Sequence, residues 1–141
     1  MKITEIFNTY DPLIINRPYV IAEAGVNHEG DFELAKRLIY EAAEGGAHAI
    51  KFQTYKAETL ASKDSPYYWD LNKEPTESQF ELFKKYDKFG KKEYELLKSE
   101  CDKAGIEFMS TPFDTVSADL LNDLMSVYKI SSSDITNIPF I

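Results

Sequence analysis

The chain alternates between short apolar runs, which are typical of buried strands, and longer stretches in which apolar residues recur at helical spacing. Residues 19–25 ("YVIAEAG") and 49–55 ("AIKFQTY") are the first two predicted strands. Between them, residues 31–46 carry apolar side chains on one helical face and predict a helix. Asp31 can cap the start of this helix, and the Gly45-Gly46 pair can end it.

A polar and aromatic segment, residues 56–75, interrupts this rhythm. It is too long for an ordinary connection between a strand and a helix, so we expect a functional loop. Thr76 and Gln79 form a capping-box pattern ahead of a helix at residues 80–86. A further helix follows and is expected to stop at Gly105.

The rest of the pattern predicts a strand at residues 107–113, a helix at 116–125 and a fourth strand at 127–134, with a short leading strand at 2–7 as an option. Strands that alternate with helices predict a parallel sheet with right-handed crossovers. The fold class is therefore α/β, and four such units match the first half of a TIM (β/α)8 barrel, which needs about 250 residues. A four-stranded open α/β sheet is the alternative. Since no helix follows the fourth strand, we expect residues 1–141 to be the N-terminal half of a barrel domain, with the remaining barrel absent.

Composition places the chain among globular proteins, because 43% of its residues are hydrophobic and 13% are aromatic. With 24 acidic and 16 basic residues, the net charge is −8, which argues against nonspecific binding to nucleic acid or to an anionic membrane. The single cysteine, Cys101, cannot form an internal disulfide. Neither a signal peptide nor an apolar stretch of about 20 residues is present. We therefore expect a cytoplasmic protein.

Each predicted strand is apolar at its start and polar toward its end. Period-two geometry places Ile21 with Glu23 on one face, and Lys51 with Gln53 on one face. In a parallel α/β protein, ligands bind at the carboxyl edge of the sheet. We therefore expect Glu23 to face a pocket, with Lys51 as its compensating charge. The alternative is a buried ion pair that only sets the strand register.

The later strand ends favour the pocket. The third predicted strand carries Ser110 and Thr111 near its end, and the fourth carries Lys129, the serines at 131–133 and Asp134. Lysines, hydroxyl groups and exposed backbone N–H groups suit a phosphate or a carboxylate. Two lysines and a glutamate on successive strands indicate an anion-binding active site, where the serines alone would indicate only a turn and a helix cap.

Other candidate residues favour structural roles. His28 has the residue type of an acid or a ligand, but a loop-shaping role fits its position better, and His48 is expected to be structural. Cys101 lies on the apolar stripe of a predicted helix and is expected in the core. Residues 65–73 ("SPYYWDLNK") group aromatic side chains with Asn72, and they fit either a packed cover or a lid that contacts a sugar.

Four segments carry a family resemblance: "IAEAGVNHEGD", "IKFQTY", "FMSTPFD" and "YKISSSDITNIPFI". In this order and spacing they resemble the N-terminal half of the sialic acid synthase family, and the resemblance covers residues 18–141. It implies a condensation of phosphoenolpyruvate (PEP) with N-acetylmannosamine, or a related N-acetylated hexosamine, and water, which gives a nine-carbon 2-keto sugar acid and phosphate. It also implies a (β/α)8 barrel, a C-terminal antifreeze-like domain, a domain-swapped homodimer and a divalent metal, manganese or magnesium.

The resemblance implies roles for the residues that would contact the sugar. Glu23 matches a glutamate near the sugar and the reacting carbons, and Gln53 matches a glutamine beside the sugar. Asn72 matches a sugar-contacting asparagine. Asp134 stands at a position that is often glutamate, so its carboxylate reaches less far.

The resemblance also implies contacts to PEP. Lys51 matches a lysine that holds PEP, and Thr111 matches a contact to the PEP carboxylate. Lys129 and Ser132 match contacts to the phosphate. The metal-binding histidines of the family lie beyond Ile141, so the metal ligands are expected outside this segment.

In the implied chemistry, C3 of PEP attacks the aldehyde of the open-chain sugar, which the metal polarises. Water then adds at C2 and phosphate leaves, while Glu23 or Asp134 handles the protons. Three alternatives stay open: a synthase for legionaminic or pseudaminic acid, a synthase that uses a phosphorylated sugar, and an inactive fragment that serves as an interaction module.

Overall fold

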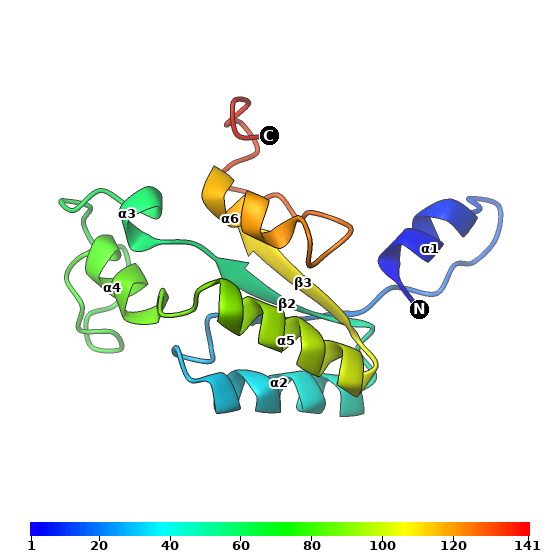
Figure 1. Ribbon diagram of the computed structural model, residues 1–141. Helices are drawn as coiled ribbons and strands as arrows, with labels where there is room; N and C mark the ends of the chain where they lie inside the picture. Colours follow the sequence, from blue (N-terminus) through cyan, green and yellow to red (C-terminus); the bar gives the residue numbers. More distant parts are fainter.

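The computed structural model describes residues 1–141 and contains one three-stranded parallel sheet (Figure 1). The strands β1 (Ile21–Gly25), β2 (Ala49–Thr54) and β3 (Glu107–Pro112) are adjacent in chain order, and both strand pairs are parallel. This arrangement confirms the predicted α/β class. The helices are α1 (Ile3–Thr9), α2 (Phe32–Glu44), α3 (Ala57–Leu60), α4 (Gln79–Tyr86), α5 (Lys91–Ala104) and α6 (Thr115–Leu121).

The hydrophobic core lies between the sheet and helices α2 and α5, which cover the same face (Figure 1). The core side chains that are 1% exposed or less include Ala35, Ile39, Ile50, Phe52, Leu97, Cys101 and Phe108. Burial confirms the predicted core position of Cys101 and raises the pKa of its thiol to about 12. Because the even-numbered strand residues face the helices, the odd-numbered ones face the opposite side of the sheet.

The predicted helix ends are confirmed where a local signal determines them. The Asp31 carboxylate accepts hydrogen bonds from the N–H groups of Glu33 and Leu34, at 2.8 and 3.1 Å, and caps α2. Gly45 ends that helix. Gly105 ends α5 with a φ of 74°, a left-handed conformation that glycine adopts without steric cost.

The prediction of a fourth strand at residues 127–134 is wrong. This segment is not part of the sheet, which has three strands and not the predicted four. The Tyr128 hydroxyl donates to the Ala118 carbonyl of α6 at 2.9 Å, and the Asp134 N–H donates to the Ser131 carbonyl at 3.0 Å. A strand here would have a neighbour on one side only. The recorded hydrogen bonds of this segment are therefore local, and no ladder joins it to β3.

Two smaller corrections have local causes. Residues 2–7 contribute to α1 and not to a leading strand, because Ile3, Ile6 and Phe7 follow a helical period. The predicted capping box of Thr76 and Gln79 is wrong as well: α4 begins at Gln79 after Ser78, and the Thr76 hydroxyl donates to Glu74.

Helices α3 and α4 lie beyond the carboxyl ends of the strands, and α1 lies beyond the amino ends (Figure 1). The long connection between β2 and α5, which holds both α3 and α4, therefore stands at the edge where ligands bind in parallel α/β proteins. We call residues 57–86 the excursion.

Candidate active site

The candidate site lies on the face of the sheet opposite α2 and α5. Glu23 of β1 is the register partner of Lys51 of β2, and Gln53 of β2 is the register partner of Thr111 of β3. Register partners face the same side of a sheet, and Lys51 and Gln53 are two residues apart on β2, so all four residues lie on the same side of three consecutive strands. The structure brings these four predicted site residues together.

Lys51 and Glu23 form an ion pair across β1 and β2. The Lys51 side chain is 11% exposed, whereas the Glu23 side chain is 53% exposed. A nearly buried ammonium group requires a counter-charge, and Glu23 supplies it. Because the Glu23 carboxylate is exposed to solvent, Lys51 can exchange it for an anionic ligand or bind both.

Gly25 is the point where the ends of β1 and β2 approach each other. Its φ is 55°, and the strand register shifts between Glu23 and Gly25. A Cβ atom at Gly25 would lie 3.7 Å from both Gln53 Nε2 and Glu23 Oε1. The Gln53 amide and the Glu23 carboxylate therefore flank the same small residue, a feature that the strand pattern alone did not single out.

The two hydroxyl residues of β3 have different surroundings. Ser110 faces the helices, where its hydroxyl forms a 2.7 Å hydrogen bond with Thr54 Oγ1. Thr111 faces the other side with Lys51 and Gln53, and its side chain makes no hydrogen bond within the chain. Thr111 is 2% exposed, and on this face its hydroxyl is the one without a partner in the chain.

The remaining predicted site residues stand apart from this group. Lys129 is exposed and lines a cavity of about 280 Å³ with Pro112, Tyr128 and Phe140, and none of Glu23, Lys51, Gln53 or Thr111 lines it. The structure therefore does not place Lys129 in one cavity with Lys51. The displacement follows from the missing fourth strand.

The serine cluster after Lys129 is organised by its own hydrogen bonds. Ser131 is buried, and its Oγ lies 2.8 Å from the Oγ of Ser133, which also donates to Asp134 Oδ2 at 3.3 Å. Ser132 is exposed. Neither Ser132 nor Asp134 forms a hydrogen bond or an ion pair with the residues on the sheet.

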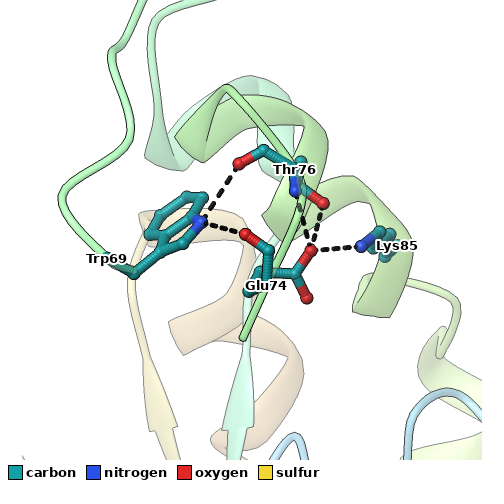
Figure 2. A network of polar contacts seen from close by, with 4 residues as sticks. All are labelled: Trp69, Glu74, Thr76 and Lys85. Carbon is teal, nitrogen blue, oxygen red and sulfur yellow. Dashed lines mark hydrogen bonds and ion pairs between the residues drawn. The ribbon is translucent and has the colours of Figure 1, made fainter. Parts of the chain in front are cut away.

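The aromatic part of the excursion, residues 65–76, is ordered by a local hydrogen-bond network, and we call it the aromatic cover. The Trp69 indole N–H donates to the carbonyls of Glu74 and Thr76, both at 3.0 Å, and the Glu74 carboxylate accepts from Thr76 and from Lys85 of α4 (Figure 2). The bonds from Lys85 and Thr76 lower the pKa of Glu74 to about 2. Asn72 is exposed, and its side chain donates to Asp70 Oδ1 at 3.0 Å. It forms no hydrogen bond with the site residues on the sheet.

The two histidines have the structural surroundings that their positions indicated. His28 is 1% exposed, and its ring stacks on Phe89 with the centroids 4.3 Å apart. His48 accepts a hydrogen bond from the Val20 N–H through Nδ1 at 2.9 Å and stacks on Tyr19. Desolvation lowers the pKa of His28 to about 4.

The residues present do not fit a divalent metal by themselves. No group of three or more His, Cys, Asp or Glu side chains gathers closely enough to hold an ion. The polar residues of the candidate site are instead one lysine, one carboxylate, one amide and one hydroxyl, which suit an organic anion. None of the helices has the length and apolar character of a membrane span.

Residues 38–141 match the NeuB family. The chain is 44% identical over 126 residues to an N,N'-diacetyllegionaminic acid synthase of Legionella pneumophila, in an alignment that covers 87% of this chain and 35% of that protein. It is 43% identical over 131 residues to a protein of the same name from Campylobacter jejuni, covering 90% of this chain and 39% of that protein. The chain thus spans little more than a third of these relatives.

The fold also matches a solved structure. The N-acetylneuraminic acid (sialic acid) synthetase of Leptospira borgpetersenii superposes with a TM-score of 0.74 and 42% sequence identity. The match covers 88% of this chain and 39% of that one.

Proposed function

The chain belongs to the NeuB family, and on that basis we propose that it is the N-terminal half of the barrel domain of a synthase that joins PEP to an N-acetylated amino sugar. The products are a nine-carbon 2-keto sugar acid and phosphate. The ion pair between Lys51 and Glu23, on the face of the sheet opposite α2 and α5, supports this proposal most directly. It combines a desolvated cation for an anionic substrate with a carboxylate that stays accessible.

In this proposal, Lys51 and Thr111 bind PEP. Lys51 is the nearly buried cation of the site, and charge-assisted hydrogen bonds from such a group are stronger than those between neutral groups. Thr111 offers a free hydroxyl one strand away. Lys129 and Ser132 are proposed to bind the phosphate once residues 127–134 pair with β3, which brings a second cation to the same edge.

Glu23 and Gln53 are proposed to face the sugar. Both flank Gly25, where the backbone leaves room beside them. The Glu23 carboxylate can move a proton to or from the water that adds at C2, or from a sugar hydroxyl. Asp134 is the second candidate for this step, and Asn72 is a further candidate contact to the sugar. A divalent metal, manganese or magnesium, would be held by residues outside this chain.

The acceptor sugar is proposed to be N-acetylmannosamine. A di-N-acetylated amino sugar is the second candidate, because the relatives that are 44% and 43% identical are named N,N'-diacetyllegionaminic acid synthases. The chain by itself is proposed to be inactive, because Lys129 and Ser132 stand apart from Lys51 in it. The complete enzyme is proposed to be a cytoplasmic homodimer.

A coupled assay of phosphate release from PEP tests the proposal. The complete synthase is supplied with N-acetylmannosamine, its 6-phosphate or a di-N-acetylated amino sugar, with and without manganese or magnesium. We expect release that depends on one of these acceptors. PEP that stays unconsumed with all three acceptors would contradict the proposed reaction, and activity of residues 1–141 alone would contradict the proposed inactivity of the fragment.

A further inference from the structure

His28 is a buried side chain for which the proposed reaction has no use. It lies in the turn between β1 and α2, five residues after Glu23, and is 1% exposed. Its Nδ1 accepts a hydrogen bond from the Gly30 N–H at 3.1 Å, which leaves the ring proton on Nε2. Nε2 is buried and has no hydrogen-bond partner within the chain. Polar contacts therefore account for only one side of the ring, and its packing accounts for the rest.

The contribution is packing that links the turn to the segment that follows the excursion, residues 87–89. The His28 ring lies parallel to the Phe89 ring, with an interplanar angle of 6°, and leans on Phe52 of β2. Phe89 in turn meets Tyr94 of α5 edge-on. The turn that follows Glu23 is therefore fastened through His28 to the segment between α4 and α5.

Other contacts of the same segment, residues 87–89, reinforce this link. The Lys88 side chain lies against Gly30, where a Cβ atom would come within 3.1 Å of the Lys88 Cβ, and its Nζ reaches the Glu29 carbonyl at 3.4 Å. The Lys56 ammonium donates to the carbonyls of Asp87 and Phe89, at 2.7 and 3.1 Å. Residues 87–89 thus hold the turn after β1 and the turn after β2 together at the carboxyl edge of the sheet.

We propose that His28 is a positioning residue: as a neutral ring clamped on Phe89, it holds the turn after β1 so that Glu23 stays opposite Lys51. The inference rests on the proposed function for its catalytic consequence. Three successive turn hydrogen bonds run from Ala24 through His28 to Asp31, so the anchor at His28 acts on the strand end that carries Glu23. Loss of the anchor frees this strand end and lowers turnover, while PEP, which is proposed to bind on β2 and β3, is still held.

Only the neutral ring fits. A second ring proton would place a donor at Nδ1 against the donating Gly30 N–H and would bury a positive charge. The charged groups on the elements around the ring are Glu29 and Asp31 in the turn and Asp87 and Lys88 in the linking segment, while β2 presents Phe52. Asp31 caps α2, and Asp87 accepts from the Ala57 N–H, so both carboxylates are already engaged.

The chain offers a matched control in His48. Its Nδ1 also accepts a backbone hydrogen bond, and its ring also stacks on an aromatic neighbour, but it lies at the amino end of β2. In the complete synthase, we expect His28→Ala to lower kcat about tenfold with less than about a twofold change in KM for PEP. His28→Phe keeps the stacked ring and should retain most of kcat. In a plot of kcat against pH, this variant should lose the part of the decline at acid pH that comes from protonation of His28. His48→Ala leaves kcat unchanged. Equal losses of kcat in His28→Ala and His48→Ala, or no loss in His28→Ala, would overturn the positioning role.

A measurement without turnover separates this inference from the proposed reaction. Nuclear magnetic resonance of the complete protein with labelled histidine should show the Nε2–H tautomer of His28, and backbone amides 29–31 should exchange faster in His28→Ala than in the parent protein. A His28 ring that titrates at its ordinary pKa, or unchanged amide exchange, overturns the clamp. Should PEP turnover be absent from the parent protein with every acceptor, the proposed function fails, and these two readouts still decide the clamp.

Discussion

At Lys51, the chain places a nearly buried ammonium group beside an exposed carboxylate. Replacement of Lys51 by Met in the complete synthase removes the cation and keeps most of the stem volume. A hydrogen bond to a charged group is worth roughly 1.5–3 kcal/mol, so the affinity for PEP should fall at least about tenfold. Steady-state kinetics or calorimetric titration measures this. Lys98→Met, which breaks an exposed pair with Asp102 on α5, is the matched control and should leave the affinity unchanged.

Glu23 is the other half of this pair, and its replacement should have a different effect. Glu23→Gln keeps the shape of the side chain and removes the carboxylate, so turnover should fall at least about tenfold, while the KM for PEP changes little. Glu41→Gln on α2 is the control, because it also removes an exposed carboxylate from an ion pair. If Glu23→Gln keeps full turnover and Lys51→Met keeps full affinity, the two residues form only a structural salt bridge.

His28 makes the stability of the fold depend on pH. Burial lowers its pKa to about 4, from an unfolded value near 6.5, so the unfolded chain binds the proton more readily. The contribution of the neutral ring is complete above about pH 6.5 and is lost as the pH falls toward 4, by about 1.4 kcal/mol per pH unit. The free energy of unfolding of the complete protein, measured by urea unfolding across this pH range, should depend less steeply on pH in His28→Phe than in the parent protein. The same pH dependence of the unfolding free energy in both proteins would show that His28 is not its source.

At the scale of elements, the order of the excursion depends on Glu74. Its carboxylate joins Thr76 to Lys85 of α4, and the carbonyls of Glu74 and Thr76 hold the indole of Trp69 (Figure 2). We expect Glu74→Gln to loosen the cover, because the neutral amide loses the charged bond to Lys85. The chain has one tryptophan, so acrylamide quenching of Trp69 fluorescence reports on the cover directly. Quenching should be stronger in Glu74→Gln than in the parent protein.

The same element should tolerate mild acid. The pKa of Glu74 is lowered to about 2, so its contribution is present above the ordinary carboxyl pKa and is lost only as the pH falls toward 2. Quenching should therefore stay constant between about pH 7 and 5 in the parent protein. Arg37→Gln, which breaks an exposed pair on α2, should not change quenching at any pH in this range. An equal change in quenching in Glu74→Gln and Arg37→Gln would show that the Glu74 network does not order the cover.

At the scale of the whole molecule, the sheet of residues 1–141 is open at both edges. β1 and β3 each have one neighbour, and Leu13, Ile14 and Ile15 are 61–100% exposed. Unpaired strand edges and exposed apolar side chains favour pairing with another chain. We therefore expect residues 1–141, expressed alone, to self-associate or to be poorly stable. Sedimentation that shows a stable, compact monomer of 16.2 kDa at all concentrations would contradict this.

Features that depend on neighbours in the sequence were predictable. The caps at Asp31 and Gly105 follow from one or two side chains and a local backbone conformation. The pair of Glu23 and Lys51 was predictable as well, because the side-chain period of a strand is two and consecutive strands of a βαβ unit are adjacent. For the same reason, Gln53 was expected on the face of Lys51, whereas Thr111 was assigned to the site only by the family resemblance.

Tertiary structure alone decided the features that join distant parts of the chain. The stack of His28 on Phe89 and the bonds from Lys56 to residues 87 and 89 connect segments with no shared pattern. Both acceptors of the Lys56 bonds are main-chain carbonyls, a group present at every residue. The fourth strand was mispredicted for a related reason. Residues 127–134 have a strand-like sequence, but pairing with β3 is a non-local choice, and in this chain Tyr128 and Ser131 find their hydrogen bonds locally. Local propensity and period are written in the sequence, whereas the competition between local turns and long-range pairing is settled only when the whole fold supplies or withholds the partner.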